Sequence, residues 1–163
     1  MHTKNILIII AILCGLALAG CSSTRVLEKY SGEKAKNMLF NRPWLDEYPQ
    51  KPDQRFMAYV YSDEGIGIHD KADSAFVHLL EIFTFRATAE KIFFLFPHDN
   101  RKAETPYKVE KISGHPPFNL RLTISQDPKV TGKPYTYFSN TDWDVSDGTT
   151  LPKEIRIFSK YLD

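Results

Sequence analysis

The chain has 163 residues and a formal net charge of +1, and its two ends differ sharply in composition. Residues 1–20 contain Lys4 as their single charged side chain and no aromatic residue. Without Lys4 the basic and acidic residues balance, so no excess of positive charge is present to hold a phosphate backbone, and we predict no nucleic-acid partner. A chain of this length buries about 68–70% of its unfolded surface, which predicts one domain that needs no disulfide.

The N-terminal segment has the layout of an export signal. A short polar start with Lys4 is followed at residues 6–20 by the apolar run ILIIIAILCGLALAG, which ends in small residues. The run is shorter than the roughly 20 residues that a stable membrane-spanning helix needs. We therefore predict that residues 1–20 are a signal peptide rather than a membrane span.

The end of this run resembles the lipobox of bacterial lipoproteins in its sequence Leu18-Ala19-Gly20-Cys21. The resemblance implies removal of residues 1–20 and lipidation of Cys21 with acyl chains that hold the protein in a membrane. An uncleaved anchor and an ordinary signal with a chance cysteine are the alternatives. Cys14 would be lost and Cys21 blocked, which leaves no thiol chemistry. Ser22 after the cysteine implies delivery to the outer membrane, facing the periplasm, in a Gram-negative host.

Residues 21–41 are polar and predict a tether between the lipidated cysteine and the folded domain. A weak helical face in this segment is interrupted by Gly32. Fully extended, the segment would reach about 66–72 Å. We therefore expect the domain, residues 42–163, to stand clear of the membrane.

The rest of the chain predicts an all-β fold. Phe118, Leu120, Leu122 and Ile124 alternate with polar residues, the pattern of a half-buried strand. About eight strand-like segments occur, with short links and no long helix, at residues 56–62, 66–68, 75–85, 92–96, 107–112, 118–125, 135–138 and 154–158. Short links favour an antiparallel meander, and eight such strands suit a closed, lipocalin-like barrel; a two-sheet β-sandwich is the alternative.

One part of this pattern does not alternate. Residues 76–85 and 92–96 are apolar on both faces, so both faces need a cover. We expect residues 41–52, with Trp44, Leu45 and Tyr48, to pack over the outside. The alternative is an exposed patch that contacts a partner or lipid.

Several short stretches resemble a group of uncharacterised bacterial lipoproteins and secreted proteins. They are residues 41–46 (NRPWLD), 67–69 (GIH), 81–85 (EIFTF), 96–97 (FP) and 137–139 (YFS), and Trp143. None of these motifs is catalytic. More distantly, the strand order resembles lipocalins and other calycins, which implies a small apolar ligand. Lipocalins carry Gly-x-Trp near the first strand, whereas Arg42-Pro43 precedes Trp44 here, so the glycine is missing.

The sequence offers no set of catalytic or metal-binding residues. His69, His78, His98 and His115 lack metal-ligand spacing, and His69 and His98 lie at predicted turns. Residues 142–148 nearly match a calcium loop, but the glycine and glutamate come one residue late, so we expect an Asp-Gly turn. We predict no enzyme activity, no cofactor and no metal.

His78 and Glu81 interrupt an apolar strand and, being three residues apart, should point to opposite faces. We expect each to form a hydrogen bond within the sheet; a ligand-orienting group in a cavity is the alternative.

Two functions fit these observations. The first is a membrane-anchored module whose barrel binds a small apolar ligand or an envelope component, with a predicted wall of Tyr59, Tyr61, His78, Phe83 and Phe94. The second is a structural or protein-interaction lipoprotein of the cell envelope, which uses the two-sided apolar strands as its contact face.

Overall fold

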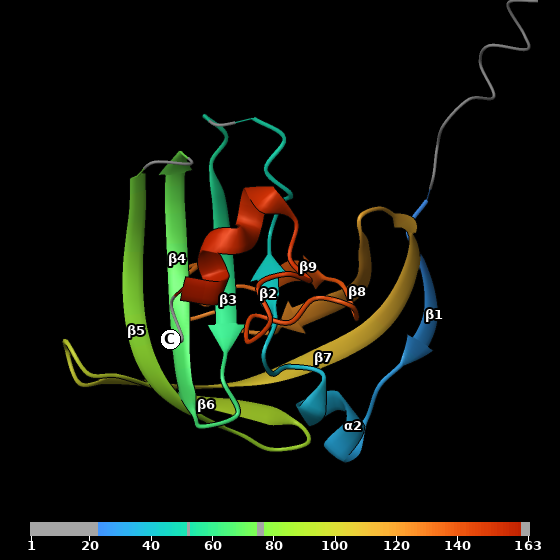
Figure 1. Cartoon of the computed structure of the whole chain (residues 1–163). Helices are drawn as coiled ribbons and strands as arrows, with labels where there is room; N and C mark the ends of the chain where they lie inside the picture. The colour runs from blue at the N-terminus through green and yellow to red at the C-terminus, as the bar shows by residue number, and fades with distance from the viewer. Residues whose placement is uncertain (1–22, 52, 75–76, 161–163) are drawn as a thin grey trace, which may run out of the picture.

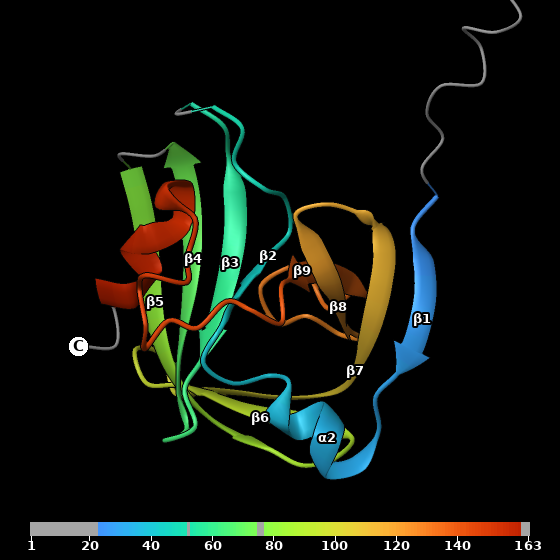
Figure 2. The ribbon, with the colours of Figure 1, turned by 45° about the vertical axis from the view of Figure 1, so that its right-hand side comes forward.

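The chain folds into one antiparallel sheet, most of which closes into a ring (Figures 1 and 2). The computed structural model describes residues 23–51, 53–74 and 77–160. In chain order the elements are β1 (Arg25–Lys29), α2 (Gly32–Asn37), β2 (Pro43–Leu45), β3 (Phe56–Tyr61), β4 (Ile66–Ser74), β5 (Val77–Ala87), β6 (Lys91–Phe96), β7 (Arg101–His115), β8 (Phe118–Ile124), β9 (Tyr135–Ser139) and the 3₁₀ helix η1 (Lys153–Lys160). The predicted all-β antiparallel meander is confirmed.

The ring closes because β7 is long enough to serve two neighbours. Residues 101–106 of β7 pair with β6, and its second half pairs with β8. Eight strands, β2 to β9, complete the ring, and β1 pairs with β7 outside it. Within the ring, β2 and β9 are the one pair of neighbours far apart in sequence, and they meet at a single residue pair, Leu45 with Phe138.

Aromatic side chains fill the interior of the ring. Strand alternation sends every second residue inward, and the inward residues of β3, β5 and β6 include Tyr59, Tyr61, Phe83 and Phe94. Gly67 of β4 makes room for one of these rings, because a Cβ at this position would overlap the ring of Phe83. The core is therefore built from rings that contact one another.

The C-terminal segment covers part of the outer face of the sheet. Ile155 and Phe158 of η1 are buried together with Phe56, Ala58 and other outward residues of β3. The strand predicted at residues 154–158 is therefore wrong. The buried residues are three apart, which is the period of a 3₁₀ helix, although the sequence also alternates like a strand.

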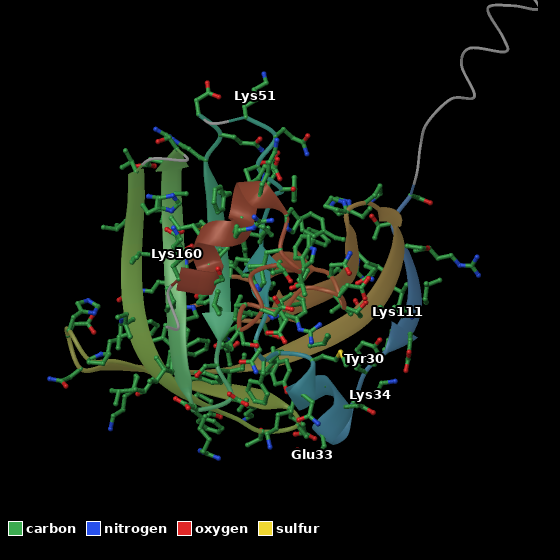
Figure 3. All side chains as sticks on the ribbon, viewed as in Figure 1. Tyr30, Glu33, Lys34, Lys51, Lys111 and Lys160 are labelled. Atoms are coloured by element: carbon green, nitrogen blue, oxygen red, sulfur yellow. The ribbon has the colours of Figure 1, made fainter. Side chains whose placement is uncertain are left out.

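The tether predicted for residues 21–41 is wrong from Arg25 onward. β1 pairs with β7, and α2 follows it immediately, with the Lys34 ammonium over the ring of Tyr30 (Figure 3). Leu39 is fully buried in the core, and its carbonyl accepts a hydrogen bond of 3.0 Å from the Trp44 indole N–H. This segment is polar because it lies on the surface, yet a few apolar side chains fix it to the ring.

Residues 41–51 do not cover the exposed apolar side chains of β5, so that expectation is also wrong. β2 lies within the sheet, between β3 and β9, and its Trp44 points into the core. The outer face of β5 stays open, with Leu80 45% and Ile82 62% exposed.

Candidate functional site

Four of the five residues predicted to line a ligand cavity form the closed core instead. Tyr59, Tyr61, Phe83 and Phe94 are at most 3% exposed. Their rings lie against one another, with centroids 5.3 Å apart for Phe83 and Phe94 and 5.5 Å apart for Tyr59 and Tyr61. None of the four is among the residues that line the surface cavity beside His78 or the cavity beside Arg42 and Trp143. The predicted wall therefore stabilises the fold, and His78 lies apart from it.

A buried carboxylate organises the polar groups of this core. Asp127 is fully buried and accepts hydrogen bonds from the hydroxyls of Tyr59 (3.0 Å) and Tyr137 (2.8 Å). The backbone N–H of Lys129 donates a third hydrogen bond, of 2.7 Å, to the same carboxylate. Burial, followed by the neighbouring charges, raises the pKa of both tyrosine hydroxyls well above the usual range, so they remain donors.

Two further polar groups of the core have no hydrogen-bond partner among the described residues. They are the hydroxyl of Tyr61 and Nε2 of His69. Burial, with smaller effects from Lys129 and Lys71, lowers the pKa of His69 to about 3, so its ring is neutral at ordinary pH. The prediction of a solvated turn at His69 is wrong, because β4 carries this residue into the interior beside Tyr59.

Glu81 belongs to a cluster of charged residues that includes the β8–β9 connection. Its carboxylate pairs with the Lys129 ammonium and lies 3.0 Å from Nδ1 of His98. The Lys129 ammonium also lies 4.3 Å from the centre of the Phe96 ring. Burial lowers the pKa of Lys129, which agrees with its small exposure. Glu81 is therefore paired within the fold, but its partners Lys129 and His98 lie in connections between strands rather than across the sheet as predicted.

His78 lies on the other face of β5, as its spacing from Glu81 predicts. Nδ1 of His78 is 2.7 Å from Oδ2 of Asp70, a buried carboxylate on β4. Ala72 pairs with His78 in the ladder, so Asp70 is the diagonal neighbour on the same face. Burial raises the pKa of Asp70 despite this contact. Strand alternation in residues 66–74 is the signal that could have placed Asp70 beside His78.

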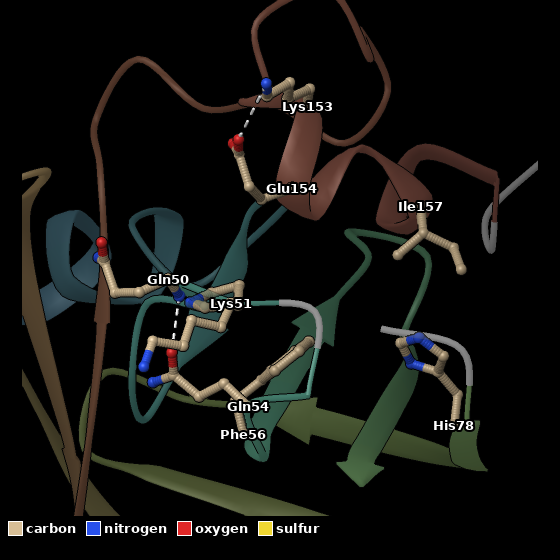
Figure 4. A pocket seen from close by; sticks show the side chains of 9 residues that line it. Gln50, Lys51, Gln54, Phe56, His78, Lys153, Glu154 and Ile157 are labelled. Carbon is tan, nitrogen blue, oxygen red and sulfur yellow. Dashed lines mark hydrogen bonds and ion pairs between the residues drawn. The ribbon is translucent and has the colours of Figure 1, made fainter. Parts of the chain in front are cut away.

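A surface cavity of about 520 Å³ adjoins His78 (Figure 4). Its apolar lining includes Phe56 and Ile157, and Lys51, Lys153 and Glu154 are among its polar lining residues. No serine, threonine or cysteine is among the described residues that line it. The His78–Asp70 pair can therefore orient a ligand in this cavity by hydrogen bonding.

The described residues contain no group of three or more His, Cys, Asp or Glu side chains that could hold a metal ion. In the calcium-like segment, Asp144 accepts from the N–H and hydroxyl of Ser146, and Asp147 does the same for Thr149. These carboxylates therefore stabilise local turns.

The second distinctive surface is formed by β5 itself. Four apolar side chains of this strand are exposed on its two faces: Val77 (58%), Leu79 (69%), Leu80 (45%) and Ile82 (62%). The first two lie on the face that continues into the core, and the last two lie on the outer face. Scattered apolar residues are common on protein surfaces, whereas here four exposed apolar side chains lie together on the two faces of one strand.

Comparison with protein-family models, with curated proteins and with solved structures gave no match. Within the described ranges, no helix has both the length and the apolar character needed to cross a membrane. The predicted signal peptide and Cys21 lie outside these ranges. The resemblances to a lipoprotein group and to lipocalins therefore stay predictions.

Proposed function

We propose that this protein is a non-enzymatic lipoprotein of the cell envelope that contacts another envelope protein through β5. The acyl chains on Cys21 hold it in the membrane, which is the outer membrane if the host is Gram-negative. The observation that carries the interaction is the exposure of apolar side chains on both faces of β5. The filled core favours this function over a ligand held inside the ring.

The position of β1 sets how the anchored domain lies. Only Ser22, Ser23 and Thr24 separate Cys21 from the first residue of β1. Four extended residue steps reach about 13–14 Å. The folded domain of the lipidated protein therefore lies close to the bilayer surface. In this position β5 can contact partner proteins in or near the same membrane.

A small amphiphilic ligand at the surface cavity is the second candidate. The cavity lies within the usual range of about 300–1,000 Å³ for ligand sites. Phe56 and Ile157 would contact the apolar part of such a ligand, and Lys51 and Lys153 would favour an anionic head group. Comparing the native and denatured masses of the purified protein tests this candidate, since a retained ligand adds mass only to the native form.

The anchor and the interaction are tested in one expression experiment with the full chain. The membrane-extracted protein should have the mass of residues 21–163 plus acyl chains, and Cys21→Ser should leave the membrane fraction. A photo-crosslinking residue at Leu79 should then give discrete adducts in intact cells, whereas one at Glu64, an exposed position in the β3–β4 turn, should not. Equal labelling at the two positions would argue against a specific contact at β5.

A further inference from the structure

The backbone of β5 has an open edge beside its apolar side chains. On one side β5 pairs with β4 along nearly its whole length. On the other side it pairs with β6 only from Thr84 to Ala87. Between Leu79 and Phe83, therefore, this second edge has no neighbouring strand in the part of the chain that the structure describes. Figures 1 and 2 show β6 turning away from β5 here, so that the upper part of β5 stands at the border of the sheet.

This edge lacks most of the features that usually prevent strands from adding to a sheet. Natural sheets protect exposed edges with proline, lysine, bulges or a covering loop. The segment from Leu79 to Phe83 contains no proline, lysine or arginine, and its register against β4 is regular. Its single charge, Glu81, is on the inward face, where it pairs with the Lys129 ammonium and lies close to His98 and Arg101. The edge is therefore open to pairing.

We propose that the edge of β5 between Leu79 and Phe83 accepts an extended segment of a partner protein as an additional β-strand. Backbone hydrogen bonds to the edge would supply affinity, and alternate side chains would supply selectivity. Because Leu79 is exposed on one face and Leu80 and Ile82 on the other, the segment should be uncharged and apolar on both faces.

A lipid surface and a second copy of the chain fit this edge less well. Lipid hydrocarbon could cover the apolar side chains, but it would leave the backbone N–H and C=O groups of the edge without hydrogen-bond partners. A second copy would pair antiparallel about a two-fold axis, which inverts one molecule relative to the other. Figures 1 and 2 place the start of β1 at the same end of the ring as the start of β5, so inversion would put the two Cys21 anchors at opposite ends. This step alone depends on the lipid anchor proposed above, because a three-residue linker cannot return both anchors to one membrane.

Fluorescence anisotropy with the full chain in detergent micelles tests the proposal. The labelled peptide has a central run of valines and threonines between lysine pairs, and a second peptide carries prolines at alternate central positions. We expect saturable binding of the first peptide and none of the second, because proline removes N–H donors. Leu80→Lys and Ile82→Lys should each weaken binding about tenfold or more by making the edge charged.

Ile66→Lys is the matched control, because Ile66 is 42% exposed on β4 and does not border the open edge. It should bind the peptide like the parent protein, and equal thermal transitions of all three variants would establish that the fold is intact. Equal binding of the proline peptide, or equal weakening by Ile66→Lys, would overturn the proposal. Crosslinks between copies that disappear with Leu80→Lys would also overturn it, in favour of a second copy. If the intact mass of the protein shows no acyl groups but the peptide still binds, the lipid anchor would be refuted and the proposal for the β5 edge would still hold.

Discussion

The hydroxyls of Tyr59 and Tyr61 provide a matched pair for testing how polar groups act in this core. Both side chains are fully buried on the same strand, and their rings stack 5.5 Å apart. The Tyr59 hydroxyl donates to Asp127, whereas the Tyr61 hydroxyl has no hydrogen-bond partner among the described residues. Replacing each with phenylalanine removes one oxygen atom and leaves the packing of the ring in place.

The two substitutions should change the free energy of unfolding in opposite directions. Tyr59→Phe removes one of three hydrogen bonds to a buried carboxylate, which costs about 1–3 kcal/mol. Tyr61→Phe removes a buried polar atom that has no compensating hydrogen bond, which should stabilise the fold by about 1 kcal/mol. The variants should therefore differ by about 2 kcal/mol or more.

Urea unfolding followed by tryptophan fluorescence measures this difference, because Trp44 and Trp143 are both buried in the folded state. The urea concentration at the unfolding midpoint should rise for Tyr61→Phe and fall for Tyr59→Phe, while the slope of the unfolding free energy against urea concentration stays the same. Equal destabilisation by the two variants would refute the reasoning, since it would mean that the Tyr61 hydroxyl has a partner of its own.

Three further outcomes follow from the fold. The pKa of His69 is about 3 in the folded state and 6.5 for an exposed histidine, so between these pH values only the unfolded state binds the proton. The free energy of unfolding from urea titrations should therefore fall by about 2 kcal/mol from pH 7 to pH 5. His69→Gln should make the free energy of unfolding less dependent on pH over this range. Gly67→Ala should lower the midpoint temperature of thermal unfolding markedly, because the added Cβ would overlap the Phe83 ring. An unchanged midpoint temperature would mean that the ring moves aside freely. Leu39→Ala should cost about 2–5 kcal/mol in denaturant unfolding, whereas Leu27→Ala, at a 54% exposed position of β1, should cost little; equal effects would contradict the burial of the segment that follows β1.

The strand pattern could be predicted because it is local. In β8 the alternation of Leu120, Leu122 and Ile124 with polar residues is visible without knowing any neighbour, and the structure buries these apolar residues. The 3₁₀ helix η1 could not be predicted in this way. Its residues Ile155, Ile157 and Phe158 satisfy both a strand period and a helical one, and only contact with the outer face of β3 selects the helix.

The polar groups of the candidate sites depended on contacts between distant parts of the chain. The sequence predicts that His78 forms a hydrogen bond in the sheet, but its partner Asp70 is defined by the register between β4 and β5. Asp127 lies in the connection between β8 and β9, and only closure of the ring brings Tyr59 and Tyr137 to it. Four of the five residues predicted to line a cavity face inward and His78 does not, and composition could not show that the inward rings fill the space.

The meeting of β2 and β9 gives the ring a seam. Every other junction in the ring joins strands that follow each other along the chain, so those junctions re-form by short loop closures. The seam joins residues from the two ends of the meander. Its backbone ladder has one paired position, Leu45 with Phe138, and the Ser139 hydroxyl donates a hydrogen bond of 2.7 Å to the Pro43 carbonyl beside it. Closing it is therefore the step of folding with the largest entropic cost, and it comes after the hairpins. We expect thermal fluctuations to open the closed sheet first at this junction, because the long strand β7 is paired along most of its length on the opposite side.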